Sequence, residues 1–137
     1  MKYKKYFRKT SLKQKKDSEF FLNEIEKSKP KCFLEVGVFH GVTARNVCEL
    51  LYQIHKNDFK YIKRQDPYTL EAVQNLLKKF KSNVHLIKGN SNKILKKIDM
   101  SKIDYVFLDG GHEYDTIMSD LNNCIEVLTK NKGVILC

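Results

Sequence analysis

An acidic residue precedes two glycines in residues 35–41, EVGVFHG. Gly37 and Gly41 allow the backbone to turn sharply after an apolar run, and they leave room for a ligand to approach. A helix starting after this turn would offer free N–H groups to an anionic group. The spacing E-x-G-x-x-x-G differs from the G-x-G-x-x-G of dinucleotide-binding turns. A carboxylate at Glu35 would repel a pyrophosphate but suits an ammonium group; the alternative is an ordinary strand-to-helix turn with a surface Glu.

A second group of polar residues lies in residues 104–115, DYVFLDGGHEYD. An aliphatic run leads to Asp109, two glycines clear the space beside it, and His112 stands at the entrance of the next expected helix. A carboxylate and an imidazole three residues apart across a turn can face one cavity. Because Asp also favours turns, the alternative makes Asp109 a turn former and His112 a surface residue.

Alternating strands and helices must position these two segments. Short apolar runs bounded by glycine or polar residues predict strands at residues 32–36, 59–62, 84–87, 103–108 and 133–137. Helical spacing predicts helices at about 17–29, with Asp17-Ser18 as N-cap, 42–55, 69–80 and 92–98, and a fifth with Ile117, Leu121, Ile125 and Leu128 on its apolar face. This α/β alternation predicts a parallel sheet with helices on both faces, which binds ligands at the carboxyl ends of its strands.

Together the two segments resemble a known family. They stand about 70 residues apart, with a strand followed by Asn90 between them, and they look like class I S-adenosyl-L-methionine-dependent methyltransferases. The D-x-x-H-x-Y pattern of residues 109–114 is similar to that of macrocin-type, often magnesium-dependent O-methyltransferases. The resemblance covers residues 31–137. It implies a Rossmann-like sheet and methyl transfer to the hydroxyl of a small molecule or saccharide.

The resemblance also implies roles for individual residues. The cofactor-binding positions that it gives are Glu35, Gly37, Val38, Phe39, Gly41, Asn90, Ser91, Asp109 and Gly110. The first five would contact the methionine part of S-adenosylmethionine, and Asn90-Ser91 would lie near the adenine. Asp109 would line the active site and, in metal-dependent members, bind Mg²⁺. His112 matches the general base.

The chain departs from the family pattern in two places. The family has an acid directly after its second strand, where it holds the ribose hydroxyls, whereas here Ile62 is followed by residues 63–65, KRQ, and the first acid is Asp66. Asp66 either holds the ribose or begins the next helix, with part of the loop missing. The family also continues beyond its fifth strand with metal ligands and two further strands. None of these follows Cys137, so we expect a C-terminally truncated, incomplete fold of about five strands.

Composition sets the remaining expectations. A chain of 137 residues, 42% of them hydrophobic, is about one domain long, here residues 17–137. It has no apolar run long enough to span a membrane and no secretory signal, so we expect a cytoplasmic protein. The net charge is +10, but only three of the 26 basic residues are Arg, which favours a solvated Lys-rich surface. The basic arm of residues 1–16 is the exception, and it suits RNA, an anionic lipid or an acidic partner.

Two other function classes stay open at this point. One is a catalytically silent fragment or an RNA-binding module that uses the basic arm; the other is a nicotinamide-dependent oxidoreductase, against which the glycine spacing argues.

The four cysteines, Cys32, Cys48, Cys124 and Cys137, are scattered through apolar segments, so we expect reduced core thiols rather than a metal site. The sequence defines neither the methyl acceptor nor the oligomeric state.

Overall fold

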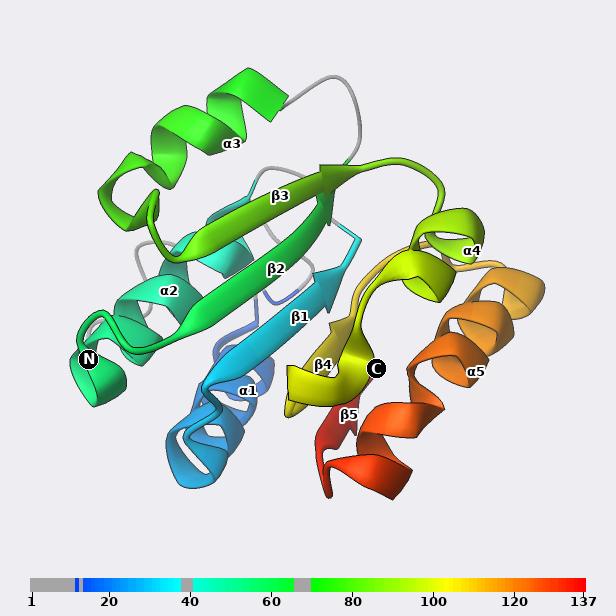
Figure 1. Cartoon of the computed structure of the whole chain (residues 1–137). Helices are drawn as coiled ribbons and strands as arrows, with labels where there is room; N and C mark the ends of the chain where they lie inside the picture. The colour runs from blue at the N-terminus through cyan, green and yellow to red at the C-terminus, as the bar shows by residue number, and fades with distance from the viewer. Residues whose placement is uncertain (1–11, 13, 38–40, 66–69) are drawn as a thin grey trace.

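One parallel sheet organises the chain (Figure 1). The computed structural model describes residue 12 and residues 14–37, 41–65 and 70–137. The strands are β1 (Cys32–Val36), β2 (Lys60–Gln65), β3 (Val84–Lys88), β4 (Tyr105–Leu108) and β5 (Val134–Leu136). They pair in the order β3-β2-β1-β4-β5, and every pairing is parallel. The predicted α/β, Rossmann-like architecture is therefore confirmed, and the carboxyl ends of its strands share one edge.

Helices cover both faces of this sheet, as predicted. They are α1 (Lys15–Ser28), α2 (Val42–His55), α3 (Leu70–Leu76), α4 (Ser91–Ile94) and α5 (Tyr114–Lys130), with the 3₁₀ turns η4 (Lys78–Phe80), η5 (Leu95–Lys97) and η6 (Met100–Lys102). Side chains of α1, α2, α3 and η4 form one apolar core, and those of η5, η6 and α5 form the other. The sheet is thus sandwiched between two cores (Figure 1).

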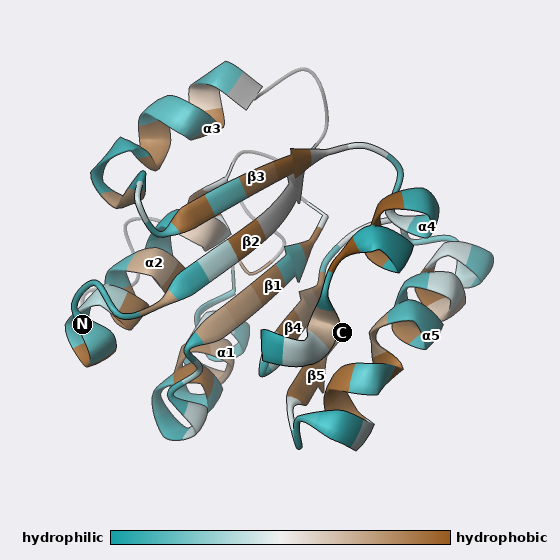
Figure 2. Cartoon of the chain, viewed as in Figure 1, coloured by the Kyte–Doolittle hydropathy of each residue, from teal (hydrophilic) through white to brown (hydrophobic). Residues whose placement is uncertain are grey.

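The central strand β1 is buried along its whole length. Its alternate residues point to opposite faces, so Phe33 packs in the core of α1 and α2 whereas Leu34 packs in the core of α5. The Phe33 ring stacks between Tyr61 of β2 and Tyr105 of β4, with ring centroids 5.0 and 4.9 Å apart. Figure 2 shows the hydrophobic strands between helices that turn hydrophilic residues outward.

Several predicted boundaries differ from the structure. Helix α1 begins at Lys15 with Gln14 as N-cap, so Asp17 lies inside the first turn instead of capping it. The helices predicted at residues 69–80 and 92–98 are each divided into a short α-helix and a 3₁₀ turn. A 3₁₀ turn satisfies backbone groups at the end of a short helix. Apolar spacing alone does not distinguish it from a continuing α-helix.

The buried face of α5 is also different from the predicted one. The structure buries Asp120, Cys124 and Val127, whereas Ile117, Ile125 and Leu128, from which the helix was predicted, are 38%, 47% and 43% exposed. Contacts at the end of the helix fix this rotation. The Gly133 N–H donates to the Val127 carbonyl at 2.9 Å, and the Asn131 amide donates to the carbonyls of Met100 and Ile103. The packing of its C-terminal end thus overrides the apolar pattern of the helix.

Polar side chains secure the opposite edge of the sheet, where the strands begin. The Asp104 carboxylate accepts hydrogen bonds from the backbone N–H groups of Lys31 and Cys32, at 2.9 and 3.0 Å. The Asn83 amide donates to the carbonyls of Asn57 and Phe59. These side chains hold the loops in place, so the edge with the amino ends is tied together by satisfied hydrogen bonds.

Cysteine burial agrees with the expectation at three positions out of four. Cys32, Cys48 and Cys124 are buried, but Cys137 is exposed because it lies just past β5, beyond either core. Burial raises the pKa of the Cys32 thiol to about 11 and that of Cys124 to about 12. These two thiols are therefore protonated and unreactive at neutral pH.

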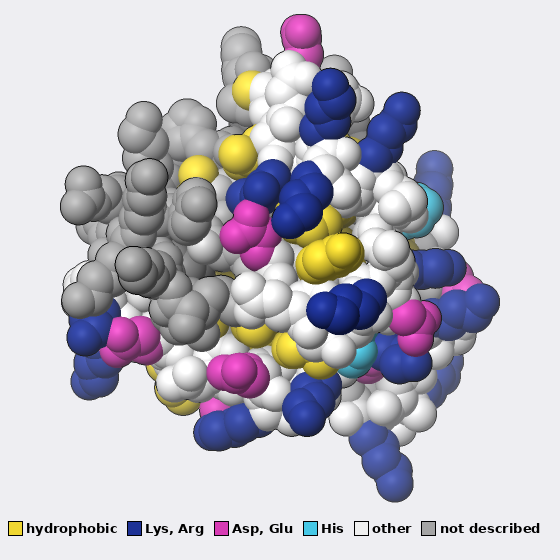
Figure 3. All heavy atoms as spheres, turned by 90° about the vertical axis from the view of Figure 1, so that its left-hand side faces the viewer, with side chains coloured by type: hydrophobic (Ala, Val, Ile, Leu, Met, Phe, Trp, Pro, Cys, Tyr) yellow, Lys and Arg dark blue, Asp and Glu magenta, His cyan; other side chains and the backbone are white. Residues whose placement is uncertain are grey.

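The basic arm of residues 1–16 lies mostly outside the described residues. On the face shown in Figure 3, Lys and Arg side chains are interspersed with acidic, polar and hydrophobic ones rather than gathered into a stripe. This distribution is typical of a solvated surface. Within the described ranges, every helix is too short or too polar to cross a bilayer.

Candidate functional site

The two segments selected from the sequence meet at the carboxyl edge of the sheet. Strands β1 and β4 are neighbours, with Val36 opposite Leu108. The pairing continues past the strand ends, since the Asp109 N–H donates to the Val36 carbonyl at 2.8 Å. The structure therefore brings the turn after β1 and the turn after β4 side by side, as the sequence predicted.

Gly37 is the point of closest approach between these turns. Its φ is +94°, and a Cβ placed on it would lie 2.1 Å from the Asp109 carbonyl oxygen and 2.3 Å from Gly110 Cα. Both are backbone atoms, so no rotamer change could relieve such a clash. The backbones of the two turns are therefore in direct contact, and the edge here presents backbone groups on which a ligand can lie.

Gly41 immediately precedes helix α2. It is the N-cap with φ +73°, and no side chain caps the helix. The first N–H groups of a 14-residue helix therefore lie next to the turn, where they favour a carboxylate or phosphate. The expected cofactor residues Val38 and Phe39 lie outside the described residues.

Glu35 lies just below this turn and is only 2% exposed. Its carboxylate accepts a hydrogen bond from the hydroxyl of Tyr61, which is fully buried. Burial and the Glu35 charge together raise the pKa of Tyr61 well above its usual value, which keeps the hydroxyl protonated as a donor. This arrangement rules out the alternative of a surface Glu at an ordinary turn.

Removing the Tyr61 hydroxyl tests how much this buried pair contributes. Tyr61→Phe keeps the ring that stacks on Phe33 but deprives a buried carboxylate of a donor, so we expect a loss of about 1–3 kcal/mol in the free energy of unfolding. Tyr105→Phe is the matched control, because Tyr105 also stacks on Phe33 but its buried hydroxyl has no partner among the described residues. Urea denaturation of both variants measures the difference; equal losses would contradict a specific role for the Tyr61–Glu35 bond.

Asn90 and Ser91 follow β3 on the same edge. Asn90 is exposed and caps α4, with its side-chain oxygen accepting the Asn92 N–H at 2.9 Å, whereas Ser91 is 2% exposed.

Strand β2 separates β3 from β1 and extends to Gln65, because its ladder with β3 continues to the Gln65–Lys88 pair. Asp66, outside the described residues, is therefore the first residue after β2. Residues 63–65, which the sequence placed between the end of this strand and Asp66, belong to the strand.

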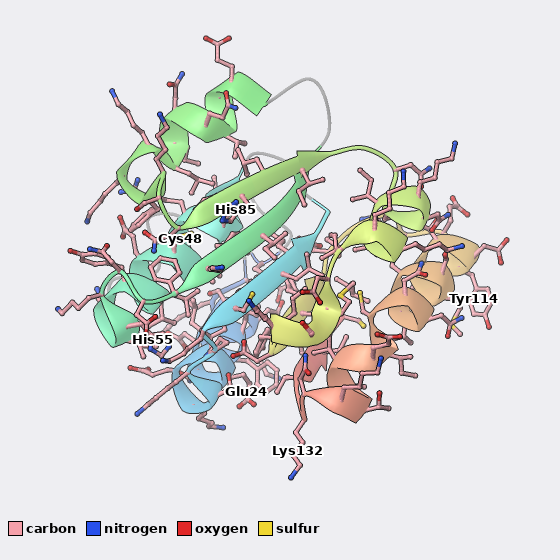
Figure 4. All side chains as sticks on the ribbon, in the orientation of Figure 1. Glu24, Cys48, His55, His85, Tyr114 and Lys132 are labelled. Carbon is pink, nitrogen blue, oxygen red and sulfur yellow. The ribbon has the colours of Figure 1, made fainter. Side chains whose placement is uncertain are left out.

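Asp109 and His112 lie on the turn between β4 and α5. Asp109 is half-buried, and His112 is exposed two residues before the helix begins. Gly111 between them packs against Thr116, where a Cβ would lie 2.9 Å from the Thr116 methyl carbon. Tyr114, which completes the D-x-x-H-x-Y pattern, is 74% exposed and projects away from the sheet (Figure 4). The turn thus holds Asp109 at the edge and leaves the His112 ring exposed on the surface.

The expected Mg²⁺ ligand is Asp109, on the turn after β4. No three His, Cys, Asp or Glu side chains there are grouped so that they could hold a metal ion. A divalent cation needs several oxygen ligands in a defined geometry. Among the described residues, the donors around Asp109 do not fit a magnesium ion, and we assign no step of the chemistry to one.

Sequence reasoning gave no role to two buried polar residues near this edge. Tyr61 looked like an ordinary strand residue, because its partner depends on the β1–β2 pairing. Asp120 of α5 is 3% exposed, and its carboxylate oxygen Oδ2 is the atom nearest to a Cβ placed on Gly110, at 3.5 Å. A usable signal was present for Asp120, since it shares the i, i+4, i+7 face of Cys124 and Val127.

Comparison with known families decides which fold family carries this site. A model of the family described as "Methyltransferase domain" matches residues 34–137, which include both turns. The chain belongs to this family. No curated protein sequence matches the chain. Nothing in these comparisons supports the nicotinamide-dependent alternative.

Solved structures of methyltransferases share the fold. The Podospora anserina methyltransferase PaMTH1, solved with S-adenosylhomocysteine bound, has 18% identity and a TM-score of 0.68 over 98% of this chain and 60% of its own. A provisionally named caffeoyl-CoA O-methyltransferase from Staphylococcus aureus has 16% identity and a TM-score of 0.64, over 89% and 56%. A SAM-dependent O-methyltransferase from Thermotoga maritima has 15% identity and a TM-score of 0.51, over 85% and 51%. The chain thus spans less than two thirds of each neighbour.

Proposed function

We propose that this chain binds S-adenosylmethionine at the carboxyl edge of its sheet and contributes to methyl transfer onto a hydroxyl of a small molecule or saccharide. The observation that carries the proposal is the backbone contact between Gly37 and the Asp109–Gly110 turn. It joins the glycine turn, the buried acid Glu35 and the Asp109–His112 turn at one edge. The family match and the fold shared with O-methyltransferases support the same activity.

The edge fits the two ends of the proposed cofactor. The turn after β1, with Glu35 below it and the start of α2 beside it, suits the ammonium and carboxylate of the methionine end. Val38, Phe39 and Gly41 would contact this end as well. Asn90 and Ser91, two strands away, are assigned to the adenine, and Asp66 after β2 to the ribose hydroxyls.

For methyl transfer, the protein has to align the acceptor hydroxyl with the methyl group and remove the hydroxyl proton. S-adenosylmethionine supplies a methyl group on a sulfonium, whose carbon–sulfur electrons remain on sulfur as the new carbon–oxygen bond forms. The exposed imidazole of His112 accepts the hydroxyl proton on a ring nitrogen. Asp109 holds the hydroxyl in position beside it. Alignment of this kind supplies a large part of the rate enhancement.

Titration of the full chain by calorimetry tests the proposal. We expect saturable binding of S-adenosylhomocysteine at a single site and no binding of NAD under the same conditions. The glycine spacing and the buried Glu35 both disfavour a pyrophosphate at the edge. Binding of NAD without S-adenosylhomocysteine would overturn the proposal in favour of a nicotinamide enzyme.

A further inference from the structure

Asp120 is a buried carboxylate with an unsatisfied oxygen. It lies in the first half of α5 and is 3% exposed. Its Oδ1 is fully enclosed, and none of the residues that the structure describes donates a hydrogen bond to it. Such a group lowers the free energy of unfolding, because burial removes its hydration and no hydrogen bond replaces it.

Tyr105 and Asp120 are the two side chains among the described residues with a buried atom that lacks a hydrogen-bond partner, and Asp120 differs in this from other buried or half-buried polar side chains. Asp104 at the opposite edge accepts two backbone N–H groups. Asn83 donates to two carbonyls, and the carboxylate of Glu35 accepts the Tyr61 hydroxyl. Asp120 has no comparable bond. Unsatisfied buried groups of this kind concentrate at sites where their charge has a use.

The position of Asp120 indicates what that use is. Its Oδ2 lies against Gly110, where a Cβ would be 3.5 Å away, and the same Cβ would be 3.9 Å from Gly37 Cα. Its carboxyl group is therefore close to the contact between the two turns of the proposed cofactor edge. It lies on the α5 side of the sheet, next to the turn that carries Asp109, although the chain as a whole carries a net charge of +10. A charge in this dry position acts over several ångström with little screening by salt.

We propose that Asp120 is a counter-charge for the sulfonium of S-adenosylmethionine, so that the chain binds the charged methyl donor in preference to its uncharged sulfur product. This inference rests on the proposed function. The ammonium and carboxylate are common to donor and product, so only the sulfonium charge distinguishes them. Asp120 acts through the field it sets up at the edge and needs no direct contact with the ligand. Weaker binding of S-adenosylhomocysteine would limit inhibition by product.

Asp120→Asn removes the charge while keeping the shape of the side chain. Calorimetric titration of the full chain with S-adenosylmethionine and, separately, S-adenosylhomocysteine measures both affinities. We expect about a tenfold loss of affinity for S-adenosylmethionine and a loss of less than about threefold for S-adenosylhomocysteine. The thermal midpoint is expected to rise by a few degrees, because an unpaired buried charge has been removed.

Glu126→Gln is the control for charge alone, since Glu126 lies on the same helix but is exposed and paired with Lys130 at 3.1 Å. It is expected to leave both affinities unchanged. Equal losses for the two ligands in Asp120→Asn, or no loss for either, would overturn the counter-charge role while leaving the proposed function intact. A wild-type chain that binds neither ligand would overturn both. If the Asn variant does not fold, Asp120→Ala gives the same ratio of affinities.

Discussion

Gly37→Ala is expected to destabilise the chain by about 4 kcal/mol or more. The added methyl group would lie 2.1 Å from the Asp109 carbonyl oxygen and 2.3 Å from Gly110 Cα. Both atoms belong to backbone that is fixed by pairing of β1 with β4, so the strand ends would have to separate. The φ of +94° adds strain of its own for a residue with a Cβ. Urea denaturation, followed by far-UV circular dichroism, measures the loss.

Gly110→Ala is the matched control on the other side of the same contact. A Cβ on Gly110 meets no atom closer than 3.5 Å, and its φ is not positive. We expect its free energy of unfolding to stay within about 1 kcal/mol of wild type. If the two variants lost the same stability, Gly37 would not be the point of closest approach. A stable Gly37→Ala variant would mean that the two turns can separate freely.

The sequence was sufficient to predict that the two turns lie at the same edge of the sheet. Strands that end in glycine turns and alternate with helices leave few parallel topologies, and in a parallel sheet both turns lie at the carboxyl edge. The structure adds the pairing of β1 with β4, which brings Gly37 against Gly110. The glycine pattern of these two turns is therefore consistent with the observed fold.

The features that escaped prediction all depend on tertiary packing. Strand β2 continues through Lys63, Arg64 and Gln65 because β3 pairs with it there, although three polar residues do not look like a strand. Helix α5 buries Asp120 instead of Ile117 because contacts at its end set its rotation. The Tyr61–Glu35 bond needs the register of two strands. Spacing along the chain carries none of this information.

These missed features change the interpretation of the site more than they change the fold. The longer β2 brings the strand end up to Asp66 and so removes one departure from the family pattern. Burial of Glu35 under Tyr61 indicates that this acid shapes the turn from below. Asp120 adds a buried carboxyl group to which the motifs gave no role. The electrostatic character of the edge is therefore a property of the packed structure.

His112→Ala is expected to lower turnover by about 10²–10⁴-fold, the usual contribution of a general base. The ring lies exposed on the turn before α5 and belongs to neither apolar core, so its removal should leave the fold intact. We expect the affinity for S-adenosylhomocysteine to change by less than about twofold, because the proton acceptor is needed only when the oxygen attacks. The rate is measured as transfer of labelled methyl from S-adenosylmethionine to the hydroxyl compound that wild type methylates fastest.

His85→Ala separates loss of a base at the edge from loss of any exposed imidazole. His85 is an exposed residue of β3, paired with Ile62 within the ladder rather than placed on a turn after a strand (Figure 4). It is expected to retain wild-type turnover. If His112→Ala keeps cofactor affinity and also turns over at the wild-type rate, His112 does not take the proton, and the base must be sought elsewhere at the edge. If it loses both cofactor affinity and turnover, His112 supports the cofactor rather than the proton transfer.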